Sequence, residues 1–129
     1  MRTRQDIEAY LLRSGLPHEE VEADMWLVHD PGSGERIVVR LADEMVLFRV
    51  KVMELEGVRQ KEKLFARLLE LNASEMLHGS YGLSDGAVVL TCVLRLASLD
   101  YEELQGTIDD FSLALTNHYE MLASFRDAA

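Results

Sequence analysis

The chain has 129 residues, 48% of them hydrophobic and 28% charged, and carries a formal net charge of -10 at pH 7. This length suits one hydrophobic core, so we expect a single domain over residues 1–129. Because nucleic-acid affinity depends on cationic side chains, 23 acidic against 13 basic residues argue against nucleic acid or an anionic membrane as the partner.

Two further features bear on the compartment. The apolar runs are shorter than the roughly 18 to 20 residues that cross a bilayer, and residues 1–6 lack the apolar core of a signal peptide. Cys92 is the only cysteine, so it cannot form an intramolecular disulfide. We expect a cytoplasmic protein in which Cys92 is a small buried hydrophobic residue.

The first predicted element is a helix with clear ends. Thr3 is followed three residues later by Asp6, which is the spacing of a capping box. The segment 14–17, Ser-Gly-Leu-Pro, provides a left-handed stop and a helix breaker. The helix is therefore expected between these two signals.

Three strands are expected next. The segment Val21 to Val28 alternates, with Val21, Ala23, Met25 and Leu27 on the predicted inner face, and residues 30–34 break it. Alternation returns over residues 36–41 and 46–52, after a short polar turn. Because connections this short do not allow a crossover, the three strands predict an antiparallel meander.

A second helix and a hairpin follow. Residues 61–72 have helical apolar spacing, and Asn72 is expected to cap the helix at its C-terminal end. Segments 78–83 and 87–96 flank Ser84-Asp85-Gly86, where Gly86 can adopt the positive φ of a hairpin turn. The run 88–94 is apolar on both faces, which predicts a central strand covered on both sides.

The last predicted helix begins most clearly. Asp100 is the expected N-cap, with Glu103 three residues later. An apolar seam follows at three-then-four spacing: Tyr101, Leu104, Ile108, Phe111, Leu115, His118, Leu122 and Phe125. The seam would pack on the chain's own sheet or against another helix. The predicted fold class is thus α+β, with helices packed on an antiparallel sheet.

Catalytic chemistry finds little support. The four histidines fall in different elements without a second ligand at metal-binding spacing, and His118 is expected to be an interface or core histidine with its hydrogen bonds satisfied. The 32–34 turn lies between two strands, unlike a phosphate-binding loop. No serine lies in a strand-to-helix elbow, and Cys92 lacks an activating base in sequence. We therefore expect no catalytic residue, no metal and no cofactor.

A family resemblance rests on four segments of the chain. They are Leu68-Leu69-Glu70-Leu71-Asn72, His78-Gly79-Ser80-Tyr81-Gly82-Leu83 with Asp85-Gly86, Val88-Val89-Leu90, and Leu99-Asp100-Tyr101-Glu102-Glu103-Leu104. With the order helix, three strands, helix, two strands, helix, the chain resembles the type III secretion chaperone-like superfamily. That superfamily includes the class I (Tir-type) chaperones and the YbjN-like proteins, and the hairpin and last helix look closer to the YbjN-like members.

The resemblance implies a homodimer that binds other polypeptides and catalyses nothing. An open edge strand and apolar patches would hold a partner. On this basis we expect the Val21–Val28 strand to be the edge, with a partner-binding patch of Tyr10, Leu12, Trp26 and Val28 if Trp26 and Val28 face solvent. The alternative for Trp26 is simple core packing. Dimer contacts are expected at Leu64, Leu68 and Met76, because the family usually dimerises through this region.

Three functions remain open at this point. The first is a homodimeric chaperone or adaptor that holds an extended segment of a partner protein. The second is a YbjN-like regulatory protein that binds a folded partner or a small effector. The third is an enzyme whose site is assembled from residues distant in sequence.

Overall fold

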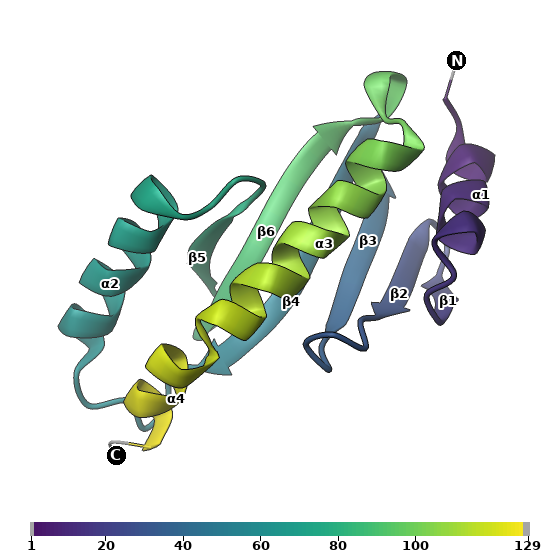
Figure 1. Ribbon diagram of the computed structural model, residues 1–129. Coiled ribbons are helices and arrows are strands. Elements are labelled where there is room, and N and C mark those ends of the chain that lie inside the picture. Colours follow the sequence, from purple (N-terminus) through teal and green to yellow (C-terminus); the bar gives the residue numbers. More distant parts are fainter. Residues whose placement is uncertain (1, 128–129) are drawn as a thin grey trace.

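The computed structural model describes residues 2–127 and consists of four helices and six strands (Figure 1). In chain order these are α1 (Arg4–Ser14), β1 (His18–Glu22), β2 (Met25–His29), β3 (Arg36–Ala42), β4 (Met45–Glu54), α2 (Lys61–Ser74), β5 (Ser80–Ser84), β6 (Ala87–Arg95), α3 (Tyr101–Asn117) and α4 (Tyr119–Asp127). A short 3₁₀ turn, Leu96–Ser98, joins β6 to α3. The α+β class predicted from sequence is confirmed.

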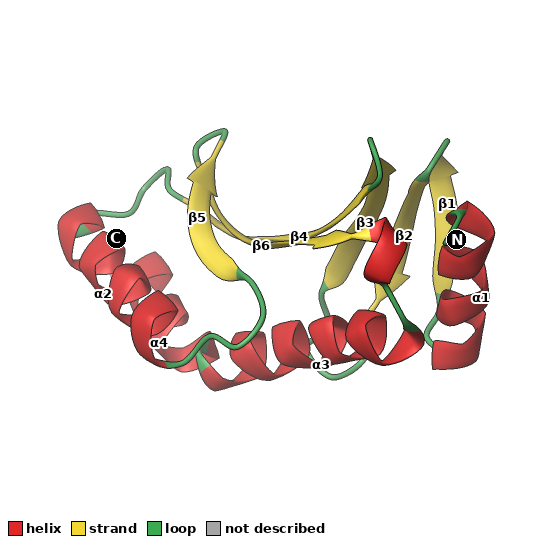
Figure 2. Cartoon of the chain, turned by 90° about the horizontal axis from the view of Figure 1, so that it is seen from above, coloured by secondary structure: helices red, strands yellow, loops and turns green. Residues whose placement is uncertain are grey.

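All six strands form one antiparallel sheet in the order β1-β2-β3-β4-β6-β5. Figure 2 shows α3 running along one side of this sheet, with α2 beside the β5 edge and α1 beside the β1 edge. No helix among the described residues lies on the opposite side. The sheet therefore has a helix-covered face and a face without helices, which we call the bare face.

The core lies between the sheet and its helices. Alternate strand residues contribute to it, and each is at most 2% exposed: Trp26, Val28, Ile37, Val39, Val46, Phe48, Val50 and Leu90. The helices contribute Ile7, Leu11, Leu64, Leu71, Leu104, Ile108 and Phe111, which are also at most 1% exposed. These residues recur at helical spacing, so each helix buries one stripe.

The helix ends follow the sequence signals. The Thr3 amide donates to the Asp6 carboxylate at 2.7 Å, and Gly15 ends α1 in the left-handed conformation with φ of 73°. The Asp100 carboxylate accepts from the Glu103 amide at 2.7 Å at the start of α3. Both predicted starts are confirmed because short polar side chains satisfy amides that no helical carbonyl can reach.

The first predicted strand is wrong in both extent and phase. Residues 18–29 form two strands joined by a turn at Ala23 and Asp24, where Asp24 has φ of 61°, so the meander has four strands. Alternation continued across this turn and disguised it. Beyond the turn Trp26 and Val28 face the core, while Val21 and Ala23, predicted to be inside, are exposed.

Asn72 does not cap the middle helix. The helix α2 continues to Ser74, and the Asn72 side chain contacts the backbone of Tyr81 in β5. A side chain that bonds to a distant strand is a tertiary contact, so local sequence gives no signal for it. The hairpin turn, by contrast, is as predicted, with φ of 50° at Asp85 and 74° at Gly86.

Strand β6 is internal, as predicted, and its first half is buried on both faces, but its second half is not. Residues 87–90 are buried, whereas Val93 is 52% exposed on the bare face and Thr91 is half-buried. The prediction assumed helices on both faces, and the helices here lie on one. The last predicted helix is also interrupted, because α3 ends at Asn117 and α4 begins at Tyr119.

Candidate protein-binding surfaces

The predicted patch near α1 is only partly present. Leu12 is 72% exposed, and Tyr10 is half-buried with its hydroxyl donating to the Leu99 carbonyl at 3.3 Å. Trp26 and Val28 are 2% and 0% exposed, so the condition that they face solvent is not met, and the alternative of core packing is confirmed for Trp26. Among the four, Leu12 alone presents a large apolar surface, and its contact with a partner stays a prediction.

The sheet edge beside α1 is β1, not the Val21–Val28 segment. It is short, it has a bulge between Glu20 and Glu22, and Arg4 of α1 lies against it. The Arg4 guanidinium bonds to Glu8 at 2.7 Å, Glu20 at 2.6 Å and Asp24 at 2.8 Å. Short, charged and bulged edges resist pairing with another strand.

The other edge, β5, is fastened at Tyr81, its second residue, by α2. The Tyr81 amide donates to Asn72 Oδ1 at 2.7 Å, and Asn72 Nδ2 donates to the Tyr81 carbonyl at 3.0 Å. These two bonds occupy the amide and the carbonyl of Tyr81, which are the backbone groups of this residue that point away from β6. An added strand could not pair with Tyr81 without displacing the Asn72 amide.

An apolar groove lies between α2 and β5. Its volume is about 200 Å³, and its lining includes Phe65, Leu68, Leu69 and Leu83. Leu69 and Leu83 are 68% and 53% exposed. Of the residues predicted for a dimer interface, Leu64 is 0% exposed and Leu68 is 4% exposed at the base of the groove. The surface available to a second copy is therefore formed by Leu69 and Leu83, next to the predicted residues.

Met76, the third residue predicted for the dimer interface, lies in a smaller neighbouring cleft. This cleft of about 50 Å³ lies between the segment after α2 and helix α3. Leu77 and Leu113 also line it and are 83% and 57% exposed. Apolar surface thus continues beyond the α2–β5 groove toward α3.

His118 lines the cleft and bonds to Tyr81, which lines the α2–β5 groove. Its Nδ1 lies 2.7 Å from the Tyr81 hydroxyl and its Nε2 lies 3.4 Å from Glu75 Oε1. A hydroxyl donating to Nδ1, with Nε2–H facing the carboxylate, satisfies both ring nitrogens. Burial, with the Glu75 charge nearby, raises the pKa of Tyr81 well above its usual value. The prediction of a core histidine with satisfied hydrogen bonds is confirmed, and the phenol stays neutral.

The bare face has a composition unlike the rest of the molecule. Alternation places Val38, Leu47 and Val93 there, opposite their buried neighbours in β3, β4 and β6. It also places five basic residues on this face: Arg36, Arg40, Arg49, Lys51 and Arg95. The only acidic residue within β2, β3, β4 and β6 is Glu54, the last residue of β4.

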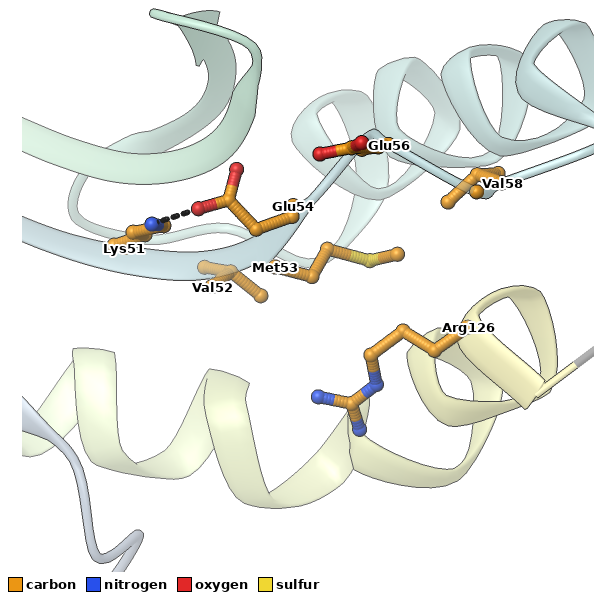
Figure 3. Close-up of a pocket in the computed structure, with 8 residues that line it drawn as sticks. Lys51, Val52, Met53, Glu54, Glu56, Val58 and Arg126 are labelled. Carbon is orange, nitrogen blue, oxygen red and sulfur yellow. Dashed lines mark hydrogen bonds and ion pairs between the residues drawn. The ribbon is translucent and has the colours of Figure 1, made fainter. Parts of the chain in front are cut away.

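A further hollow lies between the end of β4 and α4 (Figure 3). It has a volume of about 450 Å³, and the Arg126 guanidinium extends into it from α4. Among its charged groups, Lys51 is paired with Glu54, and Arg126 lies 5.5 Å from the centre of the Tyr119 ring. The cavity holds no convergent set of groups that would act on a substrate.

Metal-binding arrangements are missing from the part of the chain that the structure describes. Within residues 2–127, no three His, Cys, Asp or Glu side chains are placed to hold a metal ion. Burial raises the pKa of the Cys92 thiol, which disfavours the reactive thiolate. His78 is paired with Asp110 on α3. None of the described helices is both long and apolar enough to span a membrane.

Sequence reasoning missed Leu69, Leu83 and the bare face. The bare face had a usable signal, because Leu47, Arg49 and Lys51 alternate with the core residues of β4 and are matched by Arg36, Val38 and Arg40 in β3. The groove had none, because the exposure of Leu69 depends on how α2 is rotated against β5.

Known structures share this fold at low sequence identity. The complex of ExoU and SpcU from the type III secretion system of Pseudomonas aeruginosa matches with a TM-score of 0.67 and 20% identity, over 86% of this chain and 93% of the matched chain. The HopA1–SchA chaperone–effector complex gives 0.66 and 9%, over 88% and 90%. YbjN from E. coli gives 0.66 and 16%, over 93% of both chains.

Sequence comparison gives two further results. No curated protein matches this sequence. The family model CesT_Tir_1 matches residues 1–128. This match covers nearly the whole chain and agrees with the fold of the known structures, which include secretion chaperones and YbjN. The chain therefore belongs to the CesT_Tir_1 family, within the type III secretion chaperone-like superfamily.

Proposed function

We propose that this protein is a non-enzymatic, homodimeric chaperone or adaptor that holds an extended segment of a partner protein in the cytoplasm. The observation that carries this proposal is the one-sided cover of the sheet. The four described helices leave Val38, Leu47 and Val93 on a face that no helix covers. Partly exposed apolar side chains gathered on one face are typical of surfaces that bind another chain.

Family membership supports the same function. Two structures with this fold are chaperone–effector or secretion-system complexes. The two edges of the sheet are poorly suited to pairing with an added strand, and this bears on how a partner would bind. Asn72 occupies the outward backbone groups of Tyr81 in β5, and the β1 edge is short and charged. Contact across the bare face therefore suits the chain better than addition of a strand at either edge.

We place the dimer interface at the groove between α2 and β5. Leu69 and Leu83 expose more than half of their side chains there, and Phe65 and Leu68 continue the apolar lining. Two copies of this groove facing each other would bury the exposed leucines by the same patch on both subunits, as a two-fold interface requires.

Two leucines of similar exposure test the dimer. Leu69 is 68% exposed in the groove and Leu12 is 72% exposed on α1. We expect Leu69→Glu to convert a dimer into a monomer, because it places a charge in an apolar contact, while Leu12→Glu leaves the dimer intact. Sedimentation velocity at tens of micromolar measures both. A monomeric unmodified protein would remove the dimer from the account.

Purification from the native host tests the chaperone function. We expect a partner protein in stoichiometric amount, with one segment protected from protease only while this protein is bound. Mass spectrometry of the protected fragment identifies that segment. A folded partner whose protease pattern is unchanged would favour the regulatory alternative, and a small ligand that is consumed would favour an enzyme.

A further inference from the structure

The bare face carries both basic and apolar side chains, although the chain as a whole is acidic. Arg40 lies opposite Leu47, and Val38 lies opposite Arg49, in the pairing of β3 with β4. Leu47 in turn lies opposite Val93, and Met45 opposite Arg95, in the pairing of β4 with β6. Basic and apolar side chains are therefore interspersed on this face.

The arginines of this face have no acidic partners of their own. Among residues 2–127, ion pairs involve Arg4, Lys51, His78 and His118, but not Arg36, Arg40, Arg49 or Arg95. Arg49 donates to the Ser84 hydroxyl at 3.1 Å, and the other three side chains are exposed.

Acidic residues lie at the margin of this face, in β1. Glu19 pairs in register with Leu27, and Glu22 pairs with Met25. The chain as a whole carries -10, yet this face carries four arginines that form no ion pair among residues 2–127. The local excess of positive charge on the bare face is thus opposite in sign to the net charge of the chain.

We propose that the bare face binds an acidic amphipathic segment of a partner protein, in which Asp or Glu residues are interspersed with apolar ones. This inference rests on the proposed function and adds the chemistry of the partner. Carboxylates would pair with the arginines, for which the planar guanidinium offers bidentate geometry. Apolar side chains between them would cover Val38, Leu47 and Val93. The paired charges set specificity, and the covered apolar area contributes affinity.

A phosphate backbone fits this surface less well. A nucleic acid would leave the interspersed valine and leucine side chains without apolar contacts. It would also meet the acidic remainder of the chain along its length, which lowers affinity. The same argument disfavours a second copy of this acidic protein on the bare face.

Selection from a library of random dodecapeptides displayed on phage tests the proposal directly. Net charge alone would make a protein at -10 collect basic peptides. We expect instead enrichment of peptides rich in Asp or Glu together with apolar residues. Binding of a selected peptide should weaken as NaCl rises from about 50 to about 300 mM, because partly exposed pairs are screened.

Two charge-reversal variants locate the binding. Arg40→Glu with Arg95→Glu alters the bare face, and Arg59→Glu with Lys63→Glu makes the same charge change at the start of α2. All four side chains are exposed, so both variants should fold. We expect the first to weaken the selected acidic peptide by at least about tenfold and the second by less than about twofold. Circular dichroism confirms the fold of each.

Each other outcome counts against the proposal in a distinct way. Enrichment of basic or uncharged peptides overturns the acidic partner and leaves peptide binding intact. No enrichment of any class removes the proposed function as well. A single-stranded oligonucleotide that binds the unmodified protein and is lost with Arg40→Glu and Arg95→Glu would assign the face to nucleic acid. Loss of self-association in that variant would assign it to a second copy.

Discussion

The two faces of the central strands differ in exposure: one is buried under the helices and the other is partly exposed. In β4, Val46, Phe48 and Val50 are at most 2% exposed under the helices, while Leu47 and Arg49, their immediate neighbours, lie half-buried on the bare face. The backbone geometry is identical for both sets, so the difference comes from what covers each face. One face specifies the fold, and the other is available for binding.

This contrast also explains where polar groups occur. Five basic residues of the central strands lie on the bare face, where water solvates them, because burial under the helices would require a partner for each charge. On the covered side the buried His118 is paired with Tyr81. A charged binding surface can therefore be built on this sheet without cost to the core.

The largest expected effect comes from adjacent residues on the two faces. Phe48→Ala should lower the free energy of unfolding by about 3 to 5 kcal/mol, because it opens a cavity beneath the helices. Leu47→Ala should cost under about 1.5 kcal/mol, since its site is already partly in water. Urea denaturation measures both. Equal losses of unfolding free energy in the two variants would mean that the bare face is covered, which would contradict the difference between the two faces.

A smaller effect is expected at the β5 edge. Asn72→Ala should cost about 2 kcal/mol, because it leaves the Tyr81 amide and carbonyl without partners. Asn117→Ala, at an exposed helix end, serves as the control and should cost under about 0.5 kcal/mol. Thermal unfolding compares the two. A neutral Asn72→Ala would show that the edge is not closed by this side chain.

The smallest expected effect concerns Tyr81. Tyr81→Phe should cost about 1 kcal/mol at neutral pH by removing the hydrogen bond to His118. Burial raises the folded pKa of Tyr81, so the unfolded phenol ionises first and stability falls as pH rises above about 10. Removing the phenol should make that decline shallower. Parallel alkaline unfolding curves for both proteins would contradict the buried phenol.

Sequence alone predicts the parts of this fold that local chemistry determines. Thr3, Gly15 and Asp100 mark helix ends because caps act within one turn, and Asp85-Gly86 marks a hairpin because few residues adopt positive φ. The phase of β2 is not predictable in this way. Its alternation continues from β1 through the turn at Asp24, and only the three-dimensional core selects Trp26 as the inward side chain.

The binding surfaces depend still more on tertiary structure. Exposure of Leu69 and burial of Leu64 differ only by rotation about the α2 axis, and the sequence contains apolar residues at both positions. The bonds of Asn72 join residues nine apart across two elements. The bare face appears only when the register of four strands places like residues side by side.

Methyl-resolved NMR with a selected acidic peptide tests the central claim most directly, because it observes both faces in one experiment. We predict shifts for the methyl groups of Val38, Leu47 and Val93 on the bare face, and none for Val39 and Val46 beneath the helices. Shifts confined to the α2–β5 groove, or equal shifts on both faces of the sheet, would contradict the claim that this face holds the partner.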